Sequence, residues 1–130
     1  MRFSNLMCCL CLLMVAGCER AVVKQAPVSI GTVTVMIPVG DEMTTHVIED
    51  VAEGTSLETV MRKIEGADIE LTGSGTTALV TSIGGLTNSG GEGWTYRVDG
   101  QWADRGIGTF ALTPPTTVEW KHGEFSEMEP

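Results

Sequence analysis

The chain has 130 residues, of which 42% are hydrophobic and 19% are charged, and its formal net charge is -9. This length and apolar fraction predict one small globular domain. Phosphate contacts require clustered lysine and arginine side chains, so the acidic balance excludes nucleic-acid binding and a polybasic membrane anchor.

The N-terminal segment has the pattern of an exported, lipidated precursor. Arg2 precedes an uninterrupted apolar stretch over residues 6–16, which has the length of a signal-peptide core and is too short to span a bilayer. The stretch runs into Val15-Ala16-Gly17-Cys18, which resembles the bacterial lipobox. This resemblance implies cleavage before Cys18 and lipid attached to its sulfur. The competing interpretation is an ordinary secretory signal with incidental cysteines.

Cleavage at this point changes the meaning of the cysteines and of the charge. Cys8, Cys9 and Cys11 lie in the removed segment, so only the lipidated Cys18 remains, and we expect no disulfide, thiolate metal site or cysteine catalysis. Removal of residues 1–17 takes away one base and no acid, which makes the formal charge -10. We expect a protein anchored by lipid to a bacterial membrane in the cell envelope, with its domain facing the periplasm or the exterior.

Three segments follow from these features. Residues 1–17 are the expected lipoprotein signal peptide. Residues 18–27 contain several polar side chains and end at Pro27, and we interpret them as a tether. Residues 28–125 are the expected folded domain. The acidic tail after His122 is predicted to fray.

The domain is predicted to begin with a hairpin. Alternating apolar residues predict a strand over residues 28–37, and the phase of this alternation changes at Gly31, where a bulge is plausible. A turn over residues 38–42 leads to a second predicted strand over residues 43–51.

A helix is predicted next. Thr55 and Glu58 form the pattern of a capping box, and Gly66 supplies a stop. Glu58 and Arg62 have the spacing of an ion pair along the helix. One apolar face, expected to pack on a sheet, is formed by Leu57, Val60, Met61 and Ile64.

The remaining sequence is strand-like. Asp99-Gly100 is a strong hairpin signal after the strand over residues 94–98. The glycine-rich residues 84–93 are predicted to be a flexible connector or a ligand-facing loop. The pattern indicates an α+β domain with one helix on a sheet face, whose further strands are expected over residues 69–72, 78–83, 109–112 and 117–121.

Several motifs together resemble the transcobalamin-like C-terminal domain family. They include Ile83-Gly84-Gly85-Leu86, Gly93-Trp94-Thr95-Tyr96-Arg97-Val98-Asp99-Gly100, Phe110-Ala111-Leu112 and Val118-Glu119-Trp120. The resemblance implies a β-grasp-like fold with a mixed sheet and one principal helix, related to modules that bind soluble ligands. In vitamin B12 carriers this domain closes over cobalamin held by a larger helical domain.

The chain departs from that family in two respects. It leaves no room for a helical partner domain, so we do not expect it to hold cobalamin by itself. Pro114-Pro115-Thr116-Thr117 also replaces the acidic glycine turn that family members often carry before the last strand.

Aromatic residues supply the candidate ligand-binding side chains. Apart from Phe3, all of them lie from position 94 onward, and aromatic rings with polar atoms can line a ligand surface or fill a small core. We expect Phe110 and Trp120 in the core. The candidates for ligand binding are Trp94, Tyr96 and Trp102.

The sequence contains little evidence for a catalytic or a metal-binding site. His46 and His122 lie far apart, and no spacing of ligands typical of a metal site is present. We therefore expect neither an enzyme nor a cofactor. Two functions remain open: a membrane-tethered module that binds a small soluble ligand or supports a ligand-binding partner, and a structural or protein-interaction module of the cell envelope.

Overall fold

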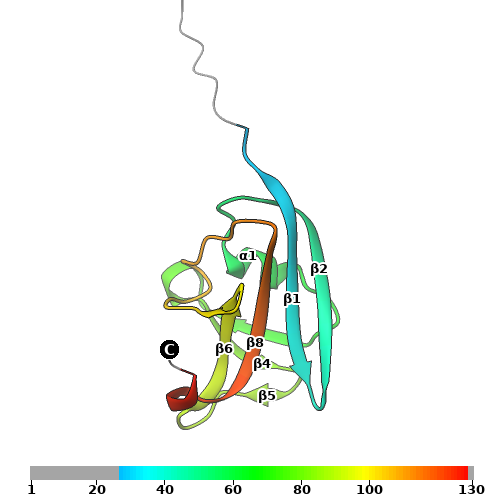
Figure 1. Ribbon diagram of the computed structural model, residues 1–130. Coiled ribbons are helices and arrows are strands. Elements are labelled where there is room, and N and C mark those ends of the chain that lie inside the picture. The colour runs from blue at the N-terminus through cyan, green and yellow to red at the C-terminus, as the bar shows by residue number, and fades with distance from the viewer. Residues whose placement is uncertain (1–26, 129–130) are drawn as a thin grey trace, which may run out of the picture.

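The computed structural model describes residues 27–128, which form two sheets and one α-helix (Figure 1). The expected signal peptide and the proposed lipidation site Cys18 lie outside the described residues. In chain order the elements are β1 (Ile30–Val39), β2 (Glu42–Ala52), α1 (Leu57–Lys63), β3 (Ile69–Thr72), a 3-10 helix (Gly75–Thr77), β4 (Leu79–Ile83), β5 (Leu86–Thr87), β6 (Glu92–Val98), β7 (Gln101–Trp102), β8 (Thr116–Glu124) and a second 3-10 helix (Phe125–Glu127).

The main sheet has five strands in the order β2-β1-β8-β6-β7. Strands β1 and β8 are parallel, and the other neighbours are antiparallel, so the sheet is mixed. The register of β1 against β2 shifts between Gly31 and Val33, which confirms the predicted bulge. The predicted α+β fold, with a mixed sheet and one helix, is therefore confirmed.

The core lies between one face of the main sheet and the layer formed by α1 and a second sheet, in the order β3-β4-β5 (Figure 1). Alternating side chains of β1 and β8 are fully buried, because a strand presents every second residue to the same face. The buried apolar residues of β1, β8 and α1 are Val33, Val35, Ile37, Val118, Trp120, Leu57, Val60 and Met61.

The start of α1 differs from the prediction. The N-cap is Ser56, whose Oγ accepts a hydrogen bond from the Thr59 backbone N–H at 3.3 Å. The Thr55 hydroxyl donates instead to the Ala52 carbonyl at 2.7 Å, so it belongs to the preceding turn. The predicted ion pair between Glu58 and Arg62 is confirmed, with a separation of 2.8 Å.

The predicted strand over residues 109–112 is wrong. Within this segment only Ala111 forms a β-bridge, and its partner is Ser56. Other backbone groups of the segment form hydrogen bonds with the start of α1. The Phe110 carbonyl accepts from the Leu57 N–H at 3.0 Å, and the Leu112 N–H donates to the Thr55 carbonyl at 2.9 Å. These bonds join the segment to the helix start.

The expectation for the C-terminal tail is also wrong. The tail does not fray after His122, because β8 continues to Glu124 and a 3-10 helix follows. The Phe125 N–H donates to the Gly91 carbonyl at 3.0 Å, and the Thr95 hydroxyl lies 2.9 Å from the Met128 sulfur. The glycine-rich residues 84–93 are two tight turns on either side of β5 rather than one long connector.

Candidate functional site

A cavity of about 190 Å³ lies between β4 and β6, where the two sheets meet. Strand β4 supplies one wall and β6 the other, while a loop over residues 103–107 closes one end. We call it the aromatic cavity because three large rings line it. Its lining residues are Ala78, Leu79, Val80, Trp94, Thr95, Tyr96, Ala103, Arg105, Gly106, Ile107 and Trp120.

Two of the rings are held by hydrogen bonds, and the third packs against one of them. The Trp94 indole N–H donates to the Leu86 carbonyl at 2.7 Å, and the Tyr96 hydroxyl donates to the Arg105 carbonyl at 2.7 Å. Trp120 packs against Tyr96 with ring centroids 5.1 Å apart. Because all three rings are buried, the wall of the cavity is formed before any ligand arrives.

The wall of the aromatic cavity is close to neutral. Burial raises the pKa of Tyr96 well above its ordinary value, so its hydroxyl stays protonated. Arg105 is the one charged lining residue among those described, and its Nε lies 2.9 Å from a carboxylate oxygen of Asp104. This pairing lowers the pKa of Asp104 and raises that of Arg105, so both groups keep their charges and offset each other.

The structure brings Trp94 and Tyr96 together in this cavity, but it places Trp102 elsewhere. Trp102 pairs with Arg97 across the β6–β7 hairpin, and paired residues share a face of the sheet. Because Arg97 alternates with Tyr96 along β6, Trp102 lies on the opposite face. The Arg97 guanidinium stands 4.1 Å from the centre of the Trp102 ring, a cation–π contact.

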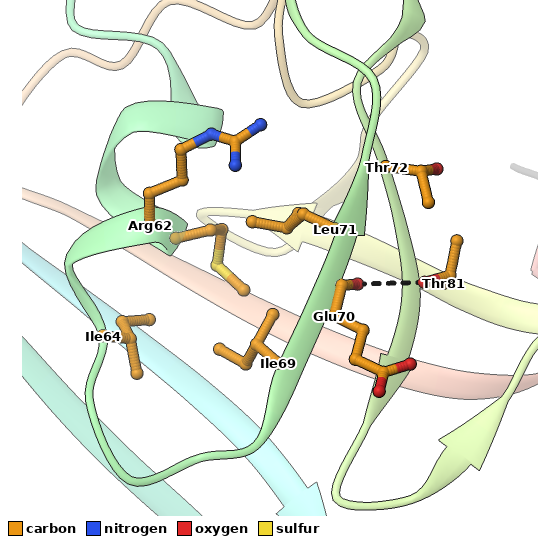
Figure 2. A pocket seen from close by; sticks show the side chains of 8 residues that line it. Arg62, Ile64, Ile69, Glu70, Leu71, Thr72 and Thr81 are labelled. Carbon is orange, nitrogen blue, oxygen red and sulfur yellow. Dashed lines mark hydrogen bonds between the residues drawn. The ribbon is translucent and has the colours of Figure 1, made fainter.

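A larger, open groove of about 620 Å³ lies between the end of α1 and β3; we call it the α1–β3 groove. Figure 2 shows Arg62, Ile64 and Leu71 around its opening, and the Glu70 carboxylate directed away from the helix. The Arg62 guanidinium is already bound to Glu58 and to the Gly73 carbonyl. Sequence reasoning did not identify this groove, although the apolar pattern of α1 and the alternation in β3 are its signals.

Sequence reasoning also missed Asn88. Its carboxamide donates from Nδ2 to the Val80 carbonyl at 2.9 Å and accepts at Oδ1 from the Trp94 N–H at 2.9 Å. This side chain therefore links β4 to β6 at one end of the aromatic cavity. An asparagine within a glycine-rich stretch was the one available signal, and it is equally typical of a turn.

Polar groups outside these hollows have structural roles. The Asp99 carboxylate accepts from the Thr117 N–H at 2.9 Å and from the Thr116 hydroxyl at 2.8 Å, which fixes the predicted β6–β7 turn. His122 lies 3.1 Å from the Thr87 carbonyl.

Within residues 27–128, no three or more His, Cys, Asp or Glu side chains gather where they could hold a metal ion. The same residues contain no helix of the length and apolarity needed to span a membrane.

Comparison with known proteins gives a family and two similar structures. The family model described as "Domain of unknown function (DUF4430)" matches residues 54–124, more than half of the chain. No curated protein matches the chain. The structure of a "putative metal binding protein" from Ruminococcus gnavus ATCC 29149 is similar with a TM-score of 0.59 and 14% sequence identity, over 72% of this chain and 97% of that one.

The second similar structure is haptocorrin in complex with Cbi. It aligns with a TM-score of 0.54 and 19% identity, over 75% of this chain and 26% of haptocorrin. At these identities the likeness extends to the fold alone. The likeness to haptocorrin agrees with the transcobalamin-like fold that the sequence motifs implied.

Proposed function

Because the chain belongs to the DUF4430 family of domains of unknown function, we propose its function from its own geometry: it is a non-catalytic module that binds a small, uncharged ligand in the aromatic cavity. The observation that carries this proposal is a preformed apolar hollow walled by Trp94, Tyr96 and Trp120. Apolar walls with a few fixed polar groups are the usual composition of small-molecule sites. The volume of about 190 Å³ limits the ligand, or the part of it that enters, to a small group.

The two similar structures support a binding role. Haptocorrin is described in complex with Cbi, and the Ruminococcus gnavus protein as a "putative metal binding protein". For this chain we propose only that it is a ligand-binding module, without carrying over either named ligand. Cobalamin is not our proposed ligand, since the chain corresponds to 26% of haptocorrin.

The β-grasp-like description is also part of this proposal. A β1–β2 hairpin followed by one helix, and a parallel pair β1–β8 at the centre of the sheet, support it.

We further propose that the module is a lipoprotein of the bacterial cell envelope, anchored through Cys18. Its support is the sequence alone: the apolar stretch over residues 6–16 leads directly into the lipobox-like Val15-Ala16-Gly17-Cys18. The lipid would hold a domain whose acidic residues outnumber its basic ones, so that net charge alone does not draw it to an anionic membrane.

A cavity-filling variant tests the binding proposal. Ala78 is buried and lines the cavity, so Ala78→Leu places three additional carbon atoms inside it. Val47→Leu, on an exposed position of β2, is the control. In a thermal-shift screen against small metabolites, with cobalamin included, a ligand at a hundred times its Kd adds about 2.7 kcal/mol of stability. We expect the Val47→Leu variant and the unchanged protein to respond alike, and Ala78→Leu not to respond. A ligand that stabilises all three proteins equally would place the site elsewhere.

The second candidate function is protein interaction, and the α1–β3 groove is the observation that favours it. Apolar side chains of α1 and β3 line part of it, and its volume of about 620 Å³ exceeds that of the aromatic cavity. One partner co-purifying in stoichiometric amount, together with no stabilisation by any metabolite, would support this alternative over the first.

A further inference from the structure

The walls of the aromatic cavity are strand edges rather than strand faces. Three consecutive residues of β6, Trp94 to Tyr96, line it, and so do Ala78 and the first two residues of β4, Leu79 and Val80. Successive side chains of a strand point to opposite faces, so a cavity that touches three in a row lies beside the backbone. The two edges face each other where the two sheets meet without pairing.

The hydrogen bonds of β6 leave two backbone groups unused at this edge. In its ladder with β8, alternate residues direct their N–H and C=O away from β8. Trp94 and Tyr96 are two of these: the Trp94 N–H donates to Asn88, and the Tyr96 carbonyl accepts from the Ala103 N–H at 3.1 Å. The Trp94 carbonyl and the Tyr96 N–H face the same side and have no partner within residues 27–128.

The Asn88 carboxamide shows which chemical group fits between the edges. It donates to the Val80 carbonyl of β4 and accepts from the Trp94 N–H of β6, both at 2.9 Å. One amide group therefore spans the gap at this end. Beyond Asn88 the gap continues as the aromatic cavity, and the next two groups along β6 are the unused acceptor and donor.

We propose that the aromatic cavity binds the backbone of one extended amino-acid residue: an uncharged N-acyl amino acid amide or one residue of a short extended peptide. Its N–H donates to the Trp94 carbonyl, its C=O accepts from the Tyr96 N–H, and its apolar side chain packs toward Trp120. This is the pattern by which an added residue continues a parallel ladder. The inference rests on the proposed function and names the ligand class of that same site.

The proposal is tested by measuring how tightly the protein binds two matched small-molecule probes. The first is N-acetyl-L-valine methylamide, and the second is its depsipeptide analogue, in which oxygen replaces the valine N–H. Loss of that donor leaves the Trp94 carbonyl buried and unpaired, so we expect the analogue to bind about tenfold more weakly or worse. Titration followed by 15N-resolved NMR gives both affinities, and the Tyr96 amide signal is expected to move with the first probe.

Each outcome has a separate meaning. Equal affinity of the two probes, or movement of other amides with the Tyr96 signal unchanged, would overturn the inference while leaving a binding cavity in place. Binding of neither probe, nor of indole as an apolar reference without a peptide group, would overturn the proposed function together with the inference. Loss of binding in Ala78→Leu, with retention in Val47→Leu, would assign the signal changes to this cavity.

Discussion

The side chain of Tyr96 belongs to the core and to the aromatic cavity at the same time. In the strand predicted over residues 94–98, Tyr96 shares a face with Trp94, because residues two apart in a strand point to the same side. Alternation alone does not indicate whether that face meets solvent or a second layer. The layer formed by β4 and the loop over residues 103–107 buries both rings and also provides the opposite wall of the cavity.

Burial of Tyr96 predicts a simple pH dependence. Its pKa is raised above the ordinary value of 10.0, mainly by desolvation, so the unfolded state ionises first as the pH rises. The stabilising contribution is complete below pH 10 and is lost above it. The chain has a single tyrosine, so near-ultraviolet absorbance of tyrosinate reports this residue alone.

We expect no tyrosinate signal near pH 10 while circular dichroism shows the native fold, and ionisation only when the protein unfolds. The guanidinium-unfolded chain is the control and should titrate near the ordinary value. Half-ionisation near pH 10 in the folded protein would contradict the burial of this ring.

At the scale of elements, local patterns predicted the structure well wherever a segment's partners are close in sequence. The β1–β2 hairpin, its bulge at Gly31 and the turn at Asp99-Gly100 depend on neighbouring residues, and they are present as predicted. The prediction of a strand over residues 109–112 failed because the hydrogen-bond partners of this segment begin at Gly54, far away in sequence. The aromatic cavity could not be predicted in full, since it requires knowing that β4 lies beside β6 without pairing to it.

Glu58 connects two of these elements and gives a second pH-dependent prediction. One carboxylate oxygen binds Arg62, and the other accepts from the Gly75 N–H at 3.0 Å, so α1 is joined to the loop before β4. The bond from Arg62, followed by that from Gly75, lowers the pKa of Glu58 below its ordinary 4.5. Its contribution to stability is present above pH 4.5 and is lost as the pH falls from there through the lowered pKa.

Glu58→Gln should therefore lower the urea midpoint at neutral pH, and the difference from the unchanged protein should shrink as the pH falls below 4.5. Glu42→Gln is the matched control, because Glu42 is exposed and forms no ion pair within residues 27–128. A Glu58→Gln deficit that stays constant down to the acid transition would assign the role of this residue to packing instead of charge.

For the whole molecule, the position of the ends matters as much as the fold. The first described residues lie at one end of the main sheet, and the C-terminal 3-10 helix lies at the opposite end (Figure 1). An anchor attached before β1 would therefore hold the domain by one end of the sheet. Cleavage at the proposed site would leave a formal charge of -10, so electrostatic attraction to an anionic membrane would not replace a lipid.

This charge makes the anchoring proposal testable by fractionation. We expect the protein, expressed in a bacterium as the complete chain, to stay with membranes through a high-salt wash and to be released by detergent, because acyl chains rather than charge hold it. Cys18→Ser has no thiol to lipidate, so we expect it to carry no acyl chains and to keep its leader, which the intact mass of the purified protein would show. Cys11→Ser removes a cysteine from the segment expected to be cleaved and should behave like the unchanged protein. If all three proteins were soluble, the leader would be an ordinary secretory signal. If Cys18→Ser were processed to the same length as the unchanged protein, or if the unchanged protein carried no acyl chains, the lipobox interpretation would be wrong.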